Sequence, residues 1–486
     1  MLGRTGLALL GLAAIVAARE MPKDMQRAAD IFDNAERHET IMAQKHALWK
    51  RQREAGLFNS ALYPPVNDVV KCVDGKAIAV PGDPMYTFNC DAMDLYQFLP
   101  HGDLGSTSAG GSSSWGWVSP EGREFVAIGQ EDGAAFIEIT KEGKMLYLGR
   151  LPPFSENAIW REIRPFGDYM VIGSEAEGHN IQIFDMKDLL TIDPTKPRIW
   201  DKKAHAIFDG LPMGRTHTVG TNPETNFAYS FGAVPRFDIC RSGIIFINMT
   251  DPLKPEKAGC AAMDGYVHDA QVLTYKGPHT KYVGREIAYG YNEDSLTIYD
   301  ITDKRRPTIV SITSYEGAAY THQGAVLDPN NQTYILMDDE YDEFDGTGLA
   351  KPGNPVTYIW DISDLEKPKQ TGTFINKKSY SIDHNQYIKD GFSYQSNYGS
   401  GFRVLDVSSI PSDPTGAGVK EVAFFDVYPE DDALPNGGLL DFVGTWSSYA
   451  FLPSRFIFVN TIERGAFVLR MQKDGPPQGN KTMKIF

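Results

Sequence analysis

The amino-acid sequence predicts an all-β protein, a seven-bladed β-propeller with an N-terminal helical extension. A short β-rich unit closed by Asp or Asn and a turn recurs seven times, at intervals of about 45 to 60 residues. A second strand-like run precedes each unit, and 46 glycines and 30 prolines supply many turns. Equivalent repeats of short strands are typical of propeller blades. The seven units begin at Gly133, Asn180, Gly243, Ser295, Val356, Gly401 and Gly465.

The N-terminus indicates export. Arg4, the apolar run from Leu7 to Val16 and the small residues Ala17 and Ala18 are typical of a secretory signal peptide. The rival interpretation is a membrane anchor, which needs about 18 to 20 apolar residues, and this run is shorter. We therefore expect a secreted, extracellular protein whose mature chain does not span a membrane, and we expect it to be a monomer.

Five segments follow one another along the predicted chain. They are a signal peptide (1–18), an N-terminal helix (19–57), a disulfide-bearing connecting segment (58–114), the seven-bladed propeller (115–471) and a polar C-terminal tail (472–486). The helix is expected as a single long one because Pro22 stands at its start and Gly56 at its end. Its apolar residues keep no strict heptad, so we expect packing on the main body or a loose pro-region rather than a coiled coil.

Four cysteines fit an oxidising compartment. Pairing Cys72 with Cys90 and Cys240 with Cys260 is the simplest of three possible connectivities. The rival interpretation is a zinc site, whose paired cysteines are usually two to four residues apart, unlike either couple here. Three glycosylation sequons become usable if the chain is exported, at Asn248, Asn331 and Asn480.

Charge and motifs exclude several classes of function. A net charge of -16 opposes a nucleic-acid partner, because binding a polyanion needs a basic surface. The sequence contains no phosphate-cradling glycine loop, so we expect no nucleotide cofactor. It also contains neither G-x-S-x-G nor H-E-x-x-H, so common hydrolase and zincin assignments lack support.

The repeated unit resembles the LVIVD repeat. The stretches GYVHDAQV, GREIAYGYNEDSLTIYDITD, YTHQGAV, LMDDEYDE, YIWDISDLEKP and IDHNQYI carry the resemblance. From about Cys72 to Arg470 the chain is similar to the choice-of-anchor B family, a group of exported or surface proteins. The resemblance implies export and a propeller-like repeat body, and it implies no particular reaction.

The strand that opens each repeat carries a polar or aromatic residue at one recurring place. If that strand is the innermost of its blade, these residues form a ring around the axis at one height. Four consecutive blades would then point imidazoles at a common centre. Along the chain the residues are Trp115, Trp160 with Arg161, His217, His268, His322, His384 and Trp446.

A transition metal held by His217, His268, His322 and His384 is one interpretation of this ring, because imidazoles from separate strands can share one ion. Neighbouring polar side chains could accept the other ring N–H and fix the tautomer. Two alternatives stay open, a structural hydrogen-bond tie within each blade and a metal-free polar pocket. Four histidines in seven blades favour a functional role. The neighbouring side chains are Asp269, Gln323, Asp383 and Asn385.

An acidic stretch lies close to the end of a predicted strand. Its Asp338, Asp339, Glu340 and Asp342 are hard oxygen ligands of the kind that calcium prefers. The rival interpretation is a solvated acidic loop. A third is that Glu340 points to the axis together with Glu175 and Glu293.

The leading hypothesis is therefore a propeller that binds a ligand or metal ion in an axial funnel. The first alternative is a metal-dependent oxidoreductase or hydrolase, in which Glu162, Asp269 or Glu340 handles protons. The second is an extracellular module that binds proteins or glycans, so the partner is a small molecule, a glycan or an extracellular protein. The expected funnel residues are Trp115, Trp160, Arg161, Glu162, Asp269, Gln323, Asn385 and Trp446.

Overall fold

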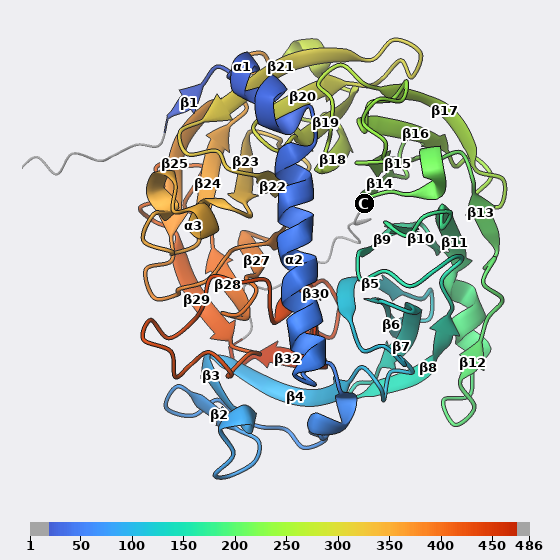
Figure 1. The fold of residues 1–486 in the computed structure, drawn as a ribbon, viewed down its shortest axis with the longest axis vertical. Coiled ribbons are helices and arrows are strands. Elements are labelled where there is room, and N and C mark those ends of the chain that lie inside the picture. The colour runs from blue at the N-terminus through green and yellow to red at the C-terminus, as the bar shows by residue number, and fades with distance from the viewer. Residues whose placement is uncertain (1–18, 474–486) are drawn as a thin grey trace, which may run out of the picture.

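Seven antiparallel sheets surround a central axis in the computed structural model, which describes residues 19–473 (Figure 1). The predicted seven-bladed β-propeller is confirmed. The predicted signal peptide and the tail from residue 474 lie outside the described residues. No helix among the described residues is both long and apolar enough to cross a membrane.

The first four blades follow the chain in order. Blade 1 contains β5 (Gly111–Val118), β6 (Glu124–Gln130), β7 (Gly133–Ile139), β8 (Met145–Leu151) and β12 (Arg198–Ile199); blade 2 contains β9 (Arg161–Phe166), β10 (Tyr169–Ser174), β11 (Ile181–Asp185) and β13 (Ala206–Phe208). Blade 3 contains β14 (Thr218–Asn222), β15 (Phe227–Phe231), β16 (Ile244–Asn248) and β17 (Glu256–Ala261); blade 4 contains β18 (Asp269–Thr274), β19 (Glu286–Tyr291), β20 (Leu296–Asp300), β21 (Thr308–Tyr315) and β1 (Glu20–Met21).

The last three blades include strands from the N-terminal part of the chain. Blade 5 contains β22 (Thr321–Val326), β23 (Tyr334–Asp339), β24 (Val356–Asp361) and β25 (Lys369–Ile375). Blade 6 contains β26 (Asn385–Lys389), β27 (Phe392–Ser396), β28 (Phe402–Asp406), β29 (Lys420–Phe425), β3 (Thr87–Asp91) and β2 (Lys76–Ile78). Blade 7 contains β30 (Thr445–Tyr449), β31 (Ile457–Thr461), β32 (Gly465–Met471) and β4 (Met93–Pro100).

Short helical turns occupy several connections. They are η2 (Ser60–Leu62), η3 (Pro84–Tyr86), η4 (Met186–Thr191), η5 (Pro212–Gly214), η6 (Thr280–Tyr282), α3 (Asp342–Asp345) and η7 (Gly348–Ala350).

The first strand of each blade lies nearest the axis. Each of β5, β9, β14, β18, β22, β26 and β30 packs beside the first strands of its two neighbouring blades. Successive residues of a strand point to opposite faces, so alternate side chains of these seven strands are directed at the axis. The residues that open the strands therefore gather at one end of it.

The ring is closed by the segment before blade 1. We expected 58–114 to be only a connection, and this was wrong, because β4 pairs with β32 as the outer strand of blade 7 and β3 pairs with β29 of blade 6. Without β4, the backbone groups of β32 would form an exposed sheet edge. Closure joins strands far apart in sequence, which a local pattern cannot reveal.

Both predicted disulfides are present. Cys72 joins Cys90 with a Cα–Cα distance of 6.0 Å, and Cys240 joins Cys260 with a Cα–Cα distance of 5.7 Å. The first bond fastens the turn before β2 to the end of β3, and the second fastens the loop before β16 to β17.

The N-terminal helix is broken rather than continuous, which corrects the expected single helix. It consists of α1 (Met25–Arg27), the π-turn η1 (Ala28–Phe32) and α2 (Glu36–Glu54), and Ala35 before α2 has a left-handed backbone with φ 70°. A left-handed residue cannot continue a right-handed helix. In Figure 1, α2 lies across the middle of the propeller disk.

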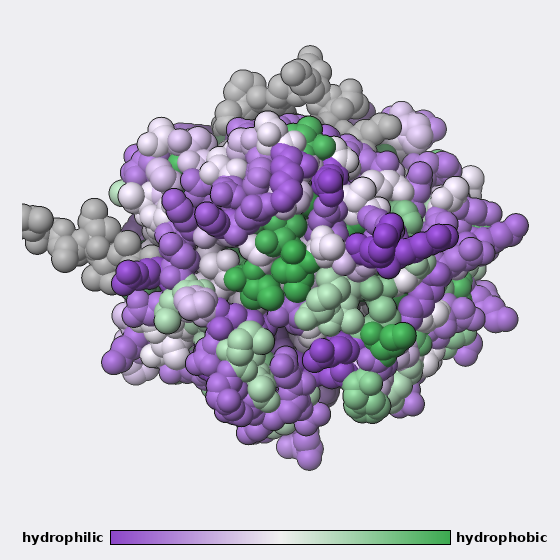
Figure 2. Space-filling view, turned by 90° about the horizontal axis from the view of Figure 1, so that it is seen from above, coloured by the Kyte–Doolittle hydropathy of each residue, from purple (hydrophilic) through white to green (hydrophobic). Residues whose placement is uncertain are grey.

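The face that α2 turns to the disk is half polar and half apolar, and it follows the helical spacing of three and four residues. Its buried residues are His38, Ile41, Lys45, Leu48, Trp49 and Gln52. The side of the molecule that Figure 2 shows is mostly hydrophilic with a few hydrophobic patches, which fits the net charge of -16.

Closure of the ring by β4 gives a stability prediction. The side chain of Phe98 is fully buried, and its ring lies 4.6 Å from that of Phe467 on β32. Replacing Phe98 by Ala should lower the free energy of unfolding by about 3 to 5 kcal/mol, because it leaves a cavity at the closure. Urea denaturation measures this. The matched control is Phe237→Ala, at a side chain that is 91% exposed, and equal effects of the two variants would contradict the assigned role of β4.

Candidate functional site

Four histidines lie in a row at the end of the axis that α2 covers. His217, His268 and His384 directly precede β14, β18 and β26, and His322 is the second residue of β22. Consecutive ring centroids in this row are 4.2, 4.4 and 4.5 Å apart, and all four residues are buried. Equivalent positions of successive blades thus bring together imidazoles from four separate sheets.

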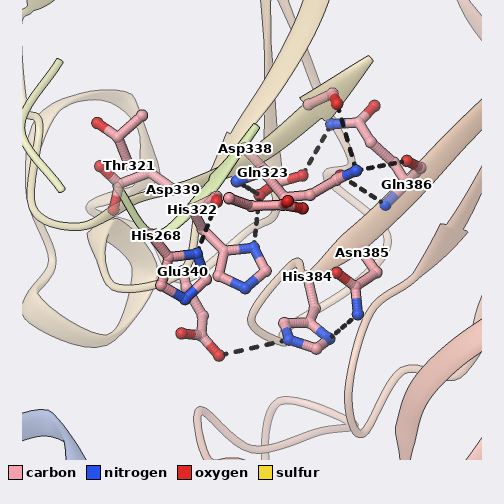
Figure 3. Close-up of polar contacts among 12 residues, drawn as sticks. His268, Thr321, His322, Gln323, Asp338, Asp339, Glu340, His384, Asn385 and Gln386 are labelled. Carbon is pink, nitrogen blue, oxygen red and sulfur yellow. Dashed lines mark hydrogen bonds and ion pairs between the residues drawn. The ribbon is translucent and has the colours of Figure 1, made fainter. Parts of the chain in front are cut away.

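Each imidazole uses Nδ1 to contact an acceptor of the protein. The Nδ1 atoms of His217, His268 and His322 donate to a carboxylate or backbone oxygen, whereas His384 Nδ1 lies both near a backbone oxygen and 3.2 Å from Asn385 Nδ2. Figure 3 shows the surroundings of His268, His322 and His384. The four acceptors are Glu175 Oε1 for His217, the backbone oxygen of His322 for His268 at 2.8 Å, Asp338 Oδ1 for His322 at 3.0 Å, and the backbone oxygen of Trp446 for His384 at 2.9 Å.

The Nε2 side of the row is crowded with acceptors. His217 Nε2 lies 2.6 Å from His268 Nε2, a contact that needs a proton or another cation because two lone pairs repel. Glu340 places a carboxylate oxygen within 4.8 Å of ring nitrogens of both His268 and His322. The same carboxylate lies 3.6 Å from His384 Nε2.

Lys45 of α2 supplies a positive charge to this group. Its Nζ lies 2.5 Å from Glu340 Oε1 and 4.6 Å from the centroid of the Phe442 ring, and the hydroxyl of Tyr398 also donates to Glu340. Next along the helix, His38 Nδ1 contacts the Tyr320 hydroxyl at 2.7 Å. The helix α2 therefore excludes solvent from this end of the axis and also contributes polar side chains that bond to the site.

Burial keeps the imidazoles of His268, His322 and His384 neutral at pH 7. It lowers the pKa of both His268 and His322 well below the usual value of 6.5, and it lowers the pKa of His384 to about 4. Burial alone would raise the pKa of Glu340, but the nearby Lys45 and His384 outweigh it and lower that pKa. Three neutral imidazoles, those of His268, His322 and His384, thus lie beside the ionised carboxylate of Glu340.

The cavity between these side chains has a volume of about 20 Å³. That is room for one water molecule or one ion and is far too small for a sugar. The cavity is lined by Lys45, Trp160, Glu162, Arg164, His217, Thr218, His268, Asp269, His322, Glu340, His384, Asn385 and Trp446. Five expected funnel residues are among them: Trp160, Glu162, Asp269, Asn385 and Trp446.

Three expected funnel residues lie elsewhere. Trp115 is the fifth residue of β5, which begins at Gly111, so it lies further along the axis, where its ring contacts Tyr387 at 5.1 Å. Arg161 points away from the cavity to His179 Nε2 at 2.7 Å, because residues adjacent in a strand face opposite sides. Gln323 lines a second cavity next to the first.

The acidic stretch after β23 is buried, so the alternative of a solvated loop is wrong. Asp339 accepts hydrogen bonds from the backbone N–H groups of Ala319, Tyr320 and Tyr341, and Asp342 accepts from the Tyr358 hydroxyl at 2.5 Å. Across the described residues, no three carboxylates of this stretch place oxygens within 4.8 Å of one another. Calcium binding here stays a prediction, and Glu340 lies at the axial site instead.

Several residues of the site were missed. One interpretation placed Glu175 and Glu293 at the axis. Glu175 is there and forms a hydrogen bond with His217, whereas Glu293 forms an ion pair with Arg236 at 2.7 Å. His38 is also buried. The spacing of positions 38, 41, 45, 48 and 52 on one helical face could have revealed His38 and Lys45. Arg164 could have been found as the residue two after Glu162 on the same face of β9.

Two of the sequons lie among the described residues. Asn331 is exposed, and Asn248 is half-buried with its Oδ1 accepting from the Thr250 backbone N–H at 2.9 Å. Asn480 lies outside the described residues.

Comparison with family models and with curated protein sequences finds no match. Among solved structures, the chain is similar to the β-propeller domain of Myceliophteria thermophila Cps50 (Swd1), at 11% identity and a TM-score of 0.42, covering 71% of this chain and 93% of that one. It is also similar to the computationally designed Ika8 protein, at 8% identity and a TM-score of 0.42, covering 84% of this chain and 96% of that one.

The lowered pKa of His384 predicts a loss of stability in acid. Below pH 6.5 the unfolded chain binds a proton at this imidazole, and the folded protein does not bind it until about pH 4. Its contribution to the free energy of unfolding should therefore fall by about 2 kcal/mol between pH 6.5 and 5. Urea denaturation at both pH values, with a chelator present, should show a smaller loss for His384→Gln. The exposed His205→Gln is the control, and a wild-type pH dependence in His384→Gln would refute the prediction.

Proposed function

We propose that the axial site binds a divalent transition metal ion, with His268, His322 and Glu340 as its central ligands. The observation that carries the proposal is the arrangement of the ring nitrogens. The Nδ1 atoms of His268 and His322 are occupied by protein acceptors, and a ring nitrogen of each lies within 4.8 Å of one carboxylate oxygen of Glu340. His217 and His384 flank this set and extend it to four imidazoles.

The chemistry of the donor set fits such an ion. Two neutral imidazoles and one carboxylate form a ligand set that suits iron, copper or zinc. Ligating histidines characteristically donate their other N–H to a carboxylate or backbone carbonyl, which is the role of Asp338 for His322. The close contact between His217 Nε2 and His268 Nε2 is relieved when a cation accepts both lone pairs.

The size of the cavity limits the chemistry that the ion could support. A volume of about 20 Å³ leaves room for one further ligand of the size of water. An oxidoreductase or hydrolase at this centre would therefore act through a water-sized ligand. Glu162 and Asp269 line the same cavity and are the nearest candidates to exchange protons with it.

Export is part of the proposal. Two disulfide bonds support an oxidising compartment, and the apolar N-terminal run supports a signal peptide. The LVIVD-type repeats, similar to those of the choice-of-anchor B family, support the same location.

Elemental analysis tests the metal site. Purified protein should contain close to one equivalent of a transition metal, and the double variant His268→Ala, His322→Ala should lose it, because two of the three central ligands are gone. Chelation should also lower the melting temperature of the wild type. His205→Ala removes an exposed histidine and should keep the metal. Metal-free wild-type protein whose melting is unchanged by chelation would overturn the proposal.

Replacing Lys45 by Met should tighten metal binding at least tenfold. The ammonium group and the metal ion compete for the carboxylate of Glu340. A single positive charge and a divalent ion about 5 Å apart repel by about 6 kcal/mol. Competition with a chromophoric chelator measures the affinity. Lys50→Met is the matched control, since Lys50 is on the same helix with a side chain that is 78% exposed. An affinity that falls, or does not change, in Lys45→Met would show that the two cations do not share this carboxylate.

A further inference from the structure

The axial site is the innermost of three cavities that follow one another along the axis. A neck of about 80 Å³ shares Arg164 and Asp269 with the histidine cavity. A wide cavity of about 840 Å³ then shares Trp115, Gln271 and Tyr387 with the neck. No residue of α2 lines the wide cavity, which lies toward the opposite face of the disk.

The strand β18 shows how the three cavities are aligned. His268 precedes it at the histidine cavity, Asp269 lines both that cavity and the neck, and Leu273 lines the wide cavity. Asp269, Gln271 and Leu273 share one face of the strand, and four residues of extended chain span about 13 Å. The wide cavity is therefore about one strand length from the histidines.

We infer that the wide cavity binds an uncharged, largely apolar small molecule, and that the neck connects it with the axial site. The volume of about 840 Å³ lies in the range of small-molecule sites, about 300 to 1,000 Å³. Aromatic and aliphatic side chains make up most of its inner wall. They include Trp115, Leu273, Ala325, Tyr387, Ile388 and Phe451.

The charges of the neck select against anions. The guanidinium of Arg164 lies 3.0 Å from Glu162 and 3.9 Å from Asp269, so one positive charge faces two carboxyls. It also stacks on the ring of Trp115, with its carbon 5.1 Å from the ring centroid. The two carboxyls thus leave no positive charge of Arg164 to pair with an acidic ligand.

At the rim of the wide cavity, the positive charges are also matched by negative charges or aromatic rings. Lys276 pairs with Glu224 at 2.9 Å, and Lys389 stacks on the Phe451 ring at 5.4 Å. Asp328 and Asp390 add two further carboxylates to the lining. Two lysines against three carboxylates, in a protein of net charge -16, leave an anion without compensation.

The narrow neck fixes how such a molecule could meet the axial centre. A volume of about 80 Å³ admits a few water molecules or a slender substituent, so the body of the ligand stays in the wide cavity. That the ligand meets a metal ion rests on the proposed function, whereas its binding in the wide cavity does not.

Two dyes that differ by one charged group test the binding site. N-phenyl-1-naphthylamine is uncharged, and 1-anilinonaphthalene-8-sulfonate carries the same ring system with an anionic sulfonate. The uncharged dye should bind the full-length protein in a 1:1 complex, detected by its fluorescence increase, and the sulfonate should bind at least tenfold more weakly. Equal or tighter binding of the sulfonate would overturn the assigned ligand class.

Two variants locate the dye. Ala325→Trp fills the cavity and Phe451→Ala removes an aromatic wall, so each should weaken binding of the uncharged dye at least tenfold. Ala61→Trp adds the same ring at an exposed position and should bind the dye like the wild type. Circular dichroism melting confirms that each variant is folded, and folded variants with wild-type dye affinity would overturn the site.

The rate of metal uptake tests the connection. Because α2 covers the other end of the axis, Ala325→Trp should slow uptake of Co²⁺ by chelated protein at least tenfold without changing the final metal content. An unchanged rate overturns the connection. Dye binding that persists in the metal-free variant His268→Ala, His322→Ala supports the wide cavity, and absence of metal from wild-type protein that binds the dye overturns the proposed metal function alone.

Discussion

Polar side chains buried at the axis are the constraint on which the rest of the structure depends. Seven inner strands converge there, so whatever side chains they carry are taken out of water and must find partners within the protein. The chain meets this demand with imidazoles, a carboxylate and the ammonium group of Lys45, which α2 brings across the disk. The helix that covers the axis is thus held by the same polar groups that it shields.

The charges of this centre are arranged so that few are left uncompensated. Glu340 has Lys45 and the hydroxyl of Tyr398 as partners, and the imidazoles of His268, His322 and His384 remain neutral because burial penalises their protonated form. Removing one partner from a buried ionic contact costs more than the contact contributes, because the other charge stays buried. The buried carboxylate of Glu340 therefore needs a positive charge beside it, which an ammonium group, a proton or a metal ion can supply.

The parts of the fold that depend on local repetition could be predicted from the sequence. Seven equivalent units fixed the number of blades, and the equivalence of their opening strands placed His217, His268, His322 and His384 together. Trp115 was placed wrongly because the sequence does not reveal that β5 begins at Gly111. Arg161 was placed wrongly because adjacent residues of a strand face opposite sides.

Contacts between distant segments could not be predicted. Lys45 and Glu340 are 295 residues apart, and nothing in either stretch points to the other. The buried face of α2 carries His38, Lys45 and Gln52, so a search for an apolar stripe passes over it. The pairing of β4 with β32 is equally non-local, and for that reason the segment before blade 1 looked like a connection.

That pairing has a consequence for biosynthesis. The ribosome releases β4 early, whereas β32, its only neighbour in blade 7, is among the last described strands to emerge. Until then the edge of β4 that pairs with β32 has no partner, and the six preceding sheets form an arc with two open ends. Nascent chains therefore carry an unpaired strand edge through almost the whole of translation, and any chain truncated before Gly465 would retain it permanently.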